Sequence, residues 1–289
     1  MQTRFPQIFK SAELQHTIEE QGYAIVDFID KEGIEGMRKE SEAMLQSMIA
    51  QGFDQVKTFH SAGRSEDTNV RNTSTQIIRK YYQPGIVKYF IYSEIDFISG
   101  VHQIKPPGSK SKLNPHQDSS HVDEEQFLAV YIWCPLEDTT MQNGTLHILP
   151  GSHKLGNKQR SLNVPWEFNK IPYYLVMYRF MQPLMVKAGQ AVIFHSAMIH
   201  SSPPNQTAKY RLAVNGLVKP KASPYCHYFT DVQTPAGMVD VFDITPEFFY
   251  TEEITKRPSA KYRLLRNEPL KKTNLNLISF YRYFAKQRN

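Results

Sequence analysis

Apolar residues in the first fifty positions are spaced as in a helix, a strand and a second helix. Residues 11–22 form a polar-rich amphipathic segment that Ser11 can cap and Gly22 can end. Residues 23–28 (YAIVDF) are a short, β-prone apolar run. After a cap at Asp30, a longer helix is expected through about residue 50, with one apolar stripe made of Ile34, Met37, Met44, Met48 and Ile49. We expect this stripe to face the core.

The next fifty residues give weaker signals. Residues 53–80 mix polar residues with weak strand signals, and we expect irregular structure there, near the entrance of a site. Residues 83–97 contain Tyr89, Phe90, Tyr92 and Ile95, whose apolar surface favours another helix. Residues 1–96 would therefore form a mostly helical N-terminal part.

From about residue 97 the sequence consists of short apolar runs separated by Pro, Gly and Asn. Runs of this length between turn signals predict strands, and a series of them predicts a sandwich or a double-sheet jelly roll. The runs are FISGVHQI, FLAVYIWCPL, GTLHILPG, LMVKAGQAVIF and YRLAVNGLVK. We predict a mainly β fold with flanking helices, a double-stranded β-helix of the cupin-like jelly-roll type, with its core at 97–220.

Two further segments stand apart from the predicted strands. Residues 154–182 are rich in aromatics and have no clear periodicity, and we interpret them as a substrate lid. Residues 221–289 are expected to pack on the core as an extension of a single domain that spans 1–289. Within them, 270–289 can form a basic amphipathic helix. Docking of this helix on the body is favoured over contact with a membrane or a partner.

Composition narrows the class of protein. The chain has 289 residues, of which 40% are hydrophobic, enough for a sizeable core. Its formal net charge of +6 fits ordinary solubility, with an anionic substrate or a membrane surface as alternatives. Two cysteines make no disulfide framework, so we expect a reduced, cytoplasmic protein. We see no secretory signal and no integral membrane segment, and the oligomeric state is left open.

The candidate chemistry centres on His116-Gln117-Asp118. On a β-strand, residues i and i+2 point to the same face, so His116 and Asp118 can reach one ion while Gln117 points elsewhere. A third candidate ligand is His200. Two imidazoles and one carboxylate leave open coordination positions and suit non-haem Fe(II) oxygenases. An H-x-D pattern alone occurs often by chance, so its weight depends on the rest of the chain.

Three segments in order carry a resemblance to a known family. They are NPHQD at 114–118, NGTLHILPGSHKLG at 143–156 and AGQAVIFHSAMIHSSPPNQTAKYRLAVN at 188–215. The chain resembles the phytanoyl-CoA dioxygenase family of Fe(II)- and 2-oxoglutarate-dependent oxygenases. That family combines an H-x-D, an N-G-x-L-x-x-x-P-G-S-H-K segment and a distal histidine followed by an arginine. The resemblance covers roughly residues 10–220 and adds nothing to the C-terminal part.

The resemblance implies Fe(II) and 2-oxoglutarate as cofactors and O2 as a co-substrate. His116, Asp118 and His200 would be the metal ligands, and Arg211 would clamp the distal carboxylate of 2-oxoglutarate, a role suited to a planar, always charged guanidinium. Ser202 lies two residues past His200 and could add a second donor. Gln117 could act beside the metal or face substrate, and Trp133 could line the co-substrate pocket or belong to the core.

Other histidines are not expected to bind the metal. His195 is separated from His200 by an odd offset, which would place it on the opposite face of a shared strand. His153 belongs to a turn-forming segment, and His147 alternates with apolar neighbours. His121 lies close to the H-x-D pair but is also not expected to be a ligand.

These features together predict a non-haem dioxygenase that hydroxylates a small-molecule substrate with release of succinate and CO2. Desaturation, epoxidation or cyclisation at the same site stay open as alternatives, as does a non-catalytic jelly-roll binding protein. We expect a small molecule and O2 as partners and no nucleic acid. The identity of the substrate does not follow from the sequence, because fold does not fix function.

Overall fold

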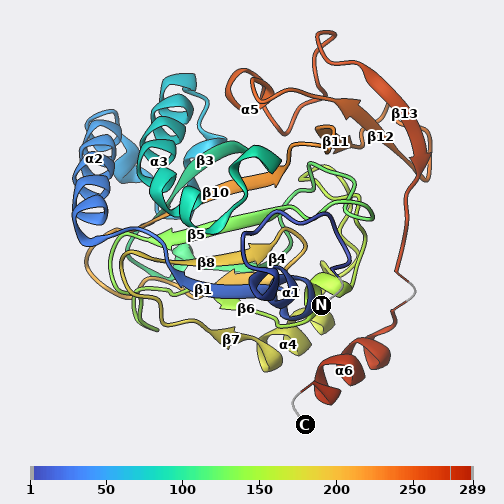
Figure 1. Ribbon diagram of the computed structural model, residues 1–289, viewed down its shortest axis with the longest axis horizontal. Coiled ribbons are helices and arrows are strands. Elements are labelled where there is room, and N and C mark those ends of the chain that lie inside the picture. The colour runs from blue at the N-terminus through green and yellow to red at the C-terminus, as the bar shows by residue number, and fades with distance from the viewer. Residues whose placement is uncertain (1–2, 274, 288–289) are drawn as a thin grey trace.

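Two antiparallel sheets, one above the other in Figure 1, form the centre of the molecule. The computed structural model describes residues 3–273 and 275–287. The larger sheet has the order β1-β8-β5-β10-β3-β2 and the smaller one β4-β9-β6-β7. Their strands are β1 (Tyr23–Asp27), β2 (His60–Ser61), β3 (Ile95–Lys105), β4 (Leu113–His116), β5 (Val130–Pro135), β6 (His147–Ile148), β7 (Gln182–Pro183), β8 (Gln190–His195), β9 (His200–Ser202) and β10 (Arg211–Pro220).

Apolar side chains of both sheets share one core cluster, in which Trp133 and Phe194 of the larger sheet join Leu146 and Ile148 of the smaller one. The predicted jelly-roll architecture is confirmed. The helices are α1 (Ala12–Gln21), α2 (Lys31–Ala50), α3 (Thr68–Tyr89), α4 (Ile171–Phe180), α5 (Phe248–Thr251) and α6 (Leu277–Lys286), with 3-10 turns at Phe53–Gln55, Ala62–Arg64, Tyr92–Glu94, Ser109–Ser111 and Ser152–Lys154.

The N-terminal predictions agree with the structure. Ser11 caps α1 by accepting from the Leu14 N–H, and Gly22 ends that helix with φ 88°. Asp30 caps α2 by accepting from the Gly33 N–H. The stripe of α2 faces the core, where Met37 is fully buried. Helices α2 and α3 pack side by side at one edge of the molecule in Figure 1.

The expectation of irregular structure over 53–80 is wrong, because α3 begins at Thr68 and continues to Tyr89. The buried positions in its first two turns, Arg71, Ser74 and Thr75, are polar, so hydrophobic periodicity does not reveal where the helix begins. The hydroxyls of Ser74 and Thr75 both donate to the Gly100 carbonyl of β3, at 3.2 and 2.9 Å. The helix expected over 83–97 is only the last part of α3, since β3 begins at Ile95.

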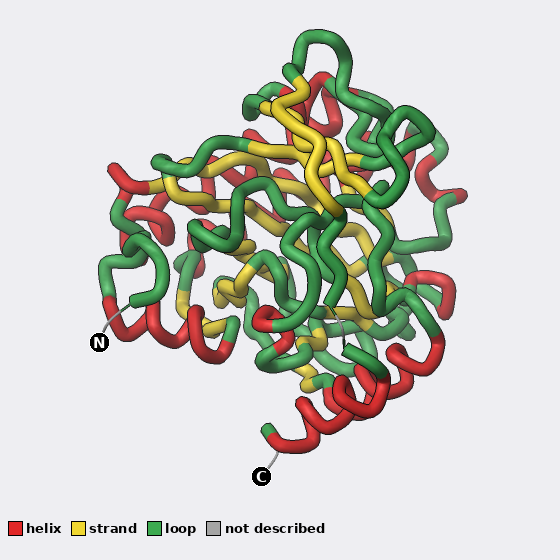
Figure 2. Tube along the Cα trace, turned by 90° about the vertical axis from the view of Figure 1, so that its right-hand side faces the viewer, coloured by secondary structure: helices red, strands yellow, loops and turns green. Residues whose placement is uncertain are grey.

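The segment 154–182 is not one long loop, because α4 occupies its second half. Apolar or aromatic side chains lie on nearly every side of this helix, which leaves no amphipathic period to detect. Helix α6 packs on α4 through Phe280 and Phe284, which are buried against Phe168, Met177 and Phe180. Figure 2 shows α6 ending beside the helical segments at the lower edge of the molecule. Helix α6 thus lies against the body through these two side chains.

Residues beyond 220 also contain a third sheet that the sequence did not predict. Its strands run in the order β11 (Cys226–Phe229), β12 (Met238–Asp243) and β13 (Leu264–Pro269). The Cys226 N–H donates to the His121 carbonyl at 3.0 Å, which ties this sheet to the segment that follows β4.

A buried histidine links α2, α3 and β3. The two ring nitrogens of His102 lie 2.7 Å from the Ser41 hydroxyl and 2.8 Å from the Ser74 hydroxyl. The ring is fully buried, and burial lowers its pKa to about 3. Both nitrogens therefore have partners while the ring is neutral, but a charged ring would be poorly solvated there.

We predict that acid weakens the fold through His102. In the unfolded chain the imidazole of His102 binds a proton below a pH of about 6.5, whereas in the folded protein it stays neutral down to about pH 3. The free energy of unfolding therefore falls as the pH falls through this window. Between pH 7 and pH 5 the wild type should lose about 2 kcal/mol more than His102→Gln, as measured by urea unfolding. Parallel pH dependences of the two proteins would contradict the prediction.

Candidate functional site

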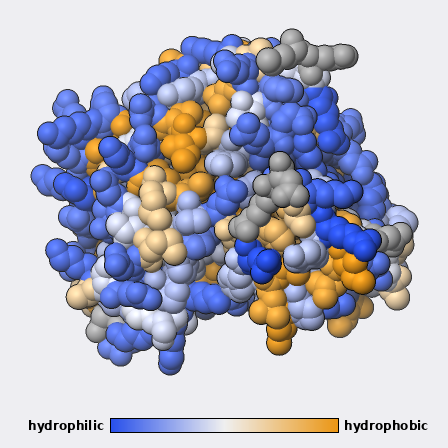
Figure 3. All heavy atoms as spheres, turned by 90° about the horizontal axis from the view of Figure 1, so that it is seen from below, coloured by the Kyte–Doolittle hydropathy of each residue, from blue (hydrophilic) through white to orange (hydrophobic). Residues whose placement is uncertain are grey.

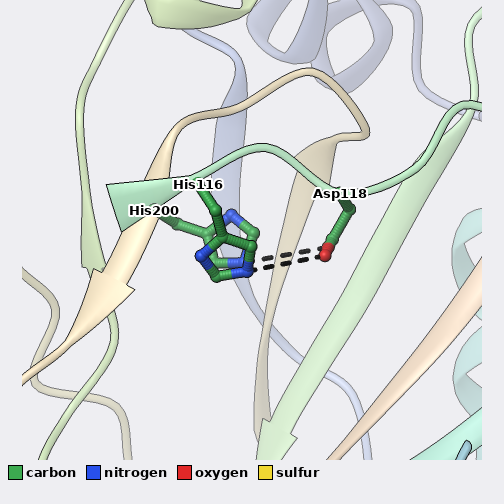
Figure 4. A group of neighbouring side chains, drawn as sticks. All are labelled: His116, Asp118 and His200. Carbon is green, nitrogen blue, oxygen red and sulfur yellow. Dashed lines mark ion pairs between the residues drawn. The ribbon is translucent and has the colours of Figure 1, made fainter. Parts of the chain in front are cut away.

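Two histidines face each other across the pairing of β4 with β9. His116 ends β4, His200 begins β9, and the two residues are directly paired in the antiparallel register. Asp118 lies two residues beyond β4. Its Oδ1 is 3.7 Å from His116 Nε2, and its Oδ2 is 3.7 Å from His200 Nε2 (Figure 4). The ligating atoms of the three residues all lie within 4.8 Å of one another, so the sequence-predicted ligands do meet at one point.

The backbone fixes the tautomer of both rings. His116 Nδ1 donates to the Asn114 carbonyl at 2.9 Å, and His200 Nδ1 donates to the Met198 carbonyl at 3.0 Å. The lone pair of each Nε2 is therefore free to face the carboxylate, and Asp118 Oδ2 is buried without a hydrogen-bond partner. Burial, and then the neighbouring His200, lower the pKa of His116 to about 4, so this ring is neutral at physiological pH. Two imidazoles oriented by second hydrogen bonds, together with a carboxylate, fit a divalent metal ion.

The strand argument for His116 and Asp118 is only partly correct, because β4 ends at His116. Arg160 takes over the support of the segment beyond it. Its Nε donates to the Asp118 carbonyl at 3.0 Å, and its own carbonyl accepts from the Ser120 N–H at 2.9 Å. Arg160 thus makes hydrogen bonds to the backbone of Asp118 and Ser120, as a neighbouring strand would.

Arg160 is itself held by a buried carboxylate. Its two terminal nitrogens each lie 2.7 Å from an oxygen of Glu124, which is fully buried and also accepts from the Ser196 hydroxyl. Burial alone would raise the pKa of Glu124, but the charge and hydrogen bonds of Arg160 more than offset it and keep the pKa well below its usual range. Sequence reasoning missed both residues, since neither belongs to a recognisable pattern.

Gln117 points away from the metal ligands, as predicted. Its Nε2 donates to the Ala197 carbonyl at 2.6 Å, and its Oε1 accepts from Trp166 Nε1 at 2.9 Å. Gln117 therefore connects the turn between β8 and β9 with the aromatic segment 154–170.

The remaining histidines occupy different surroundings. The reason given for excluding His195 is wrong, because His195 ends β8 whereas His200 begins β9, and a turn separates them. His195 Nδ1 accepts from the Ala197 N–H at 3.0 Å, and His153 Nε2 pairs with the Glu19 carbonyl at 2.9 Å. His147 lies on β6. His121 lines the cavity beside the triad.

Arg211 begins β10 in the opposite sheet and lines a narrow space together with His200, Ser202 and Trp133. The residue is 2% exposed, and its Nε and Nη1 have no hydrogen-bond partner. Its guanidinium carbon lies 5.6 Å from the centre of the Trp133 ring. Burial lowers the pKa of Arg211 to about 10, which still leaves it charged at neutral pH. A buried guanidinium with two free donors is the group expected where a carboxylate is to bind.

Ser202 and Trp133 both reach this space, with their polar atoms already engaged. The Ser202 hydroxyl donates to the Gly144 carbonyl at 2.7 Å, and Trp133 Nε1 donates to Gln103 Oε1 at 3.0 Å. Trp133 is also part of the core cluster between the sheets, so the two interpretations of this residue are compatible. Asn215 adds a buried Oδ1 that has no partner.

Lys105 is a further buried basic residue that the sequence did not single out. It pairs with Arg211 in the register of β3 and β10. Its Nζ donates to the Ser111 and Pro203 carbonyls at 2.8 and 2.7 Å. Burial, followed by the charge of Arg211, lowers the pKa of Lys105 to about 6. Backbone carbonyls therefore satisfy Lys105, in contrast with Arg211.

A cavity of about 190 Å³ is lined by His116 and Asp118 and shares Gln103 and Asn215 with the narrow space beside Arg211. Among the described residues that line it, Asp118 is the one carboxylate, and Arg64 lies exposed on its rim. The third sheet supplies His227, which is 2% exposed and has no hydrogen-bond partner at either ring nitrogen. Burial lowers the pKa of His227 to about 3. The sequence gave no signal for His227, because it lies in a strand that was not predicted.

A model of the family described as Phytanoyl-CoA dioxygenase (PhyH) matches residues 18–213 of this chain. Phytanoyl-CoA dioxygenase 1 of Oryza sativa subsp. japonica is 32% identical over 126 residues, which cover 43% of this chain and 44% of that protein. The peroxisomal phytanoyl-CoA dioxygenase of Homo sapiens is 30% identical over 193 residues, or 61% of this chain and 55% of that protein. The chain spans about half the length of the curated relatives it matches.

Solved structures share the fold at low sequence identity. The non-haem monooxygenase ThoJ aligns with a TM-score of 0.54 and 20% identity, covering 73% of this chain and 79% of that one. The α-ketoglutarate-dependent carbocyclase SnoK of nogalamycin biosynthesis aligns with a TM-score of 0.53 and 17% identity, covering 74% and 86%. HygX of Streptomyces hygroscopicus, solved with nickel, 2-oxoglutarate and hygromycin B bound, aligns with a TM-score of 0.52 and 14% identity, covering 73% and 88%. At these identities the likeness concerns the fold alone.

The family match covers more than half of the chain and includes all three residues of the His-Asp-His cluster and Arg211. The chain therefore belongs to the phytanoyl-CoA dioxygenase family.

Proposed function

We propose that this chain is a mononuclear non-haem oxygenase that depends on Fe(II) and 2-oxoglutarate and oxidises a small molecule. The observation that carries the proposal is the convergence of His116, Asp118 and His200 on one point, with both Nε2 lone pairs free. This ligand set leaves coordination positions open, as iron oxygenases require. Membership of the family supports the same chemistry.

The chain's own residues divide the work of binding. His116, Asp118 and His200 would hold the iron, and Arg211 would bind the distal carboxylate of 2-oxoglutarate with the two donors that have no partner. Trp133 would form one wall of that space, and Ser202 would lie beside Arg211 with its hydroxyl free to turn from the Gly144 carbonyl. When bound, iron and 2-oxoglutarate supply the oxidising power with O2, and 2-oxoglutarate leaves as succinate and CO2.

The substrate would enter the cavity that His116 and Asp118 line. Its walls combine apolar side chains with the polar His121 and His227, and a bound metal would offset the charge of Asp118. Such a cavity suits an uncharged or anionic small molecule and offers no carboxylate to a cation. Ser161 and Leu162 line this cavity, which supports the proposed role of residues 154–182 as a substrate lid. Hydroxylation is the proposed reaction. Desaturation, epoxidation and cyclisation are alternatives at the same site.

A non-catalytic binding protein is the competing function. Succinate release separates the two, because an iron-loaded protein that binds 2-oxoglutarate but never converts it with any substrate would be a binding module.

We also propose that residues 1–289 act as one domain in the cytoplasm. The contact between β11 and His121 supports a single domain. The free thiols of Cys134 and Cys226, which form no disulfide, support a location in the cytoplasm.

Anaerobic addition of Fe(II) and 2-oxoglutarate should give a visible charge-transfer band in the wild type and none in Asp118→Ala. The band reports chelation of the iron by 2-oxoglutarate, which needs the protein ligands in place. Asp123→Ala, which changes a carboxylate five residues away, should keep the band. Absence of the band from the wild type as well as from Asp118→Ala would overturn the proposal.

Arg211→Lys should weaken 2-oxoglutarate binding about tenfold or more while metal binding stays unchanged. Lysine keeps the charge but loses the fork that binds a carboxylate through two parallel hydrogen bonds. Anaerobic titration of the iron-loaded protein, followed through the charge-transfer band, measures the change. The same substitution at the exposed Arg263 is the control, and equal affinities for Arg211→Lys and wild type would contradict the role.

Arg160→Lys should lower metal affinity about tenfold, as loss of groups that orient ligands commonly does. Lysine has no counterpart of the Nε–H that holds the Asp118 carbonyl, and it cannot make both bonds to Glu124. Titration with Co(II) measures the affinity. Arg257→Lys breaks a comparable pair with the buried Asp240, away from the site, and should reduce Tm without changing affinity. Equal metal affinities for all three proteins would show that Arg160 acts only on stability.

A further inference from the structure

Helices α4 and α6 leave a row of apolar side chains uncovered. On α4 these are Ile171, Leu175 and Tyr178, spaced one turn apart on one stripe, with Ile171 and Leu175 74% and 67% exposed. On α6 the exposed side chains are Leu277, Ile278 and Tyr281, with Ile278 63% exposed. Exposed apolar residues are common singly, but a contiguous group on packed elements indicates an interaction surface.

The two helices lie side by side. The ring of Phe180 is 5.4 Å from that of Tyr281 and 6.2 Å from that of Phe284. Figures 1 and 2 place both helices at the same end of the molecule, and Figure 3 shows apolar side chains there beside strongly hydrophilic ones. We call the six exposed apolar residues of α4 and α6 the helix-pair face.

Cations outnumber acidic groups around the helix-pair face, where Glu125 pairs with Lys271 and Glu167 accepts from the Thr273 N–H. The sequence contains no Asp or Glu from 168 to 230 and none from 269 to 289, whereas the helices and their flanks carry a series of cations. Lys271 forms an ion pair with Glu125, but Lys170, Lys272 and Arg282 are exposed. Among the described residues, the cations of the two helices and their flanks are Lys170, Arg179, Lys271, Lys272, Arg282 and Lys286. Exposed aliphatic and aromatic residues among cations are typical of a surface that lies on an anionic membrane.

The face also lies against the strand that carries a metal ligand. The Tyr178 hydroxyl donates to Asn114 Oδ1 at 3.1 Å, and Lys112 Nζ lies 4.4 Å from the centre of the Tyr178 ring. Asn114 in turn accepts the hydrogen bond from His116 Nδ1 through its carbonyl. A surface that rests on this face would therefore lie next to β4.

We propose that the helix-pair face binds the surface of an anionic lipid bilayer, with the apolar residues among the acyl chains and the cations at the headgroups. No helix among the described residues has the length and apolar content to cross a bilayer, so the contact is peripheral. The proposal does not depend on the iron chemistry. A second copy of the chain is the other possible occupant, but two copies would bring like charges together across such a contact.

Co-sedimentation of the full chain with vesicles tests the proposal. Vesicles of phosphatidylcholine with phosphatidylglycerol should retain the protein, phosphatidylcholine alone should retain far less, and raised salt should release it. Leu175→Asp combined with Ile278→Asp should lower the partition coefficient about tenfold or more. Val232→Asp, at a fully exposed apolar residue elsewhere, is the matched control and should bind as the wild type does.

A charge-reversal pair covers the case in which the apolar variant fails to fold. Lys272→Glu combined with Arg282→Glu changes only exposed residues and should abolish the preference for anionic vesicles. Lys39→Glu on α2 should not change that preference. Equal binding of the wild type to both kinds of vesicle, or none to either, would overturn the proposal. So would a dimer in light scattering that Leu175→Asp/Ile278→Asp disperses without any vesicle binding.

Discussion

The antiparallel pairing of β4 with β9 is the constraint on which the site depends. It sets His116 opposite His200, so one register places both imidazoles. A slip of one residue would turn the side chains of one strand to the other face and separate the two rings. Each ring also donates Nδ1–H to a carbonyl two residues earlier in its own chain segment. The same short backbone segments that place the rings therefore select the tautomer that presents Nε2.

Three buried basic side chains near this pairing have three different kinds of surroundings. Glu124 and Arg160 neutralise each other through two hydrogen bonds, and Lys105 is surrounded by backbone carbonyls. Arg211 is as deeply buried, yet two of its nitrogens have no partner. Leaving a buried donor unpaired costs more free energy than any single bond contributes, so such a group stands out where its neighbours are satisfied. The contrast among three buried basic side chains within one fold is the reason for proposing that Arg211 binds an anion.

The sequence predicted what depends on short-range pattern. The jelly-roll strands and the caps at Ser11 and Asp30 follow from period and spacing, whereas the grouping of His200 with His116 and Asp118 came from the resemblance to the family. It could not predict the first half of α3, because the buried positions there include Ser74 and Thr75 and apolar burial begins only at Ile77. Arg160 and His227 were equally hidden, since each acquires its place only through contacts between segments far apart in the chain.

Helix α6 illustrates why an amphipathic pattern does not by itself reveal what a helix contacts. Phe280 and Phe284 account for its docking on α4, and the fold needs no further apolar residue from it. Leu277, Ile278 and Tyr281 nevertheless add apolar surface on the side that the body leaves open. Apolar surface that stays exposed contributes no hydrophobic free energy to folding, and in water it favours association with another apolar surface. Since Tyr178 of the neighbouring helix is bonded to Asn114 of β4, whatever covers this surface also bears on the strand that orients His116.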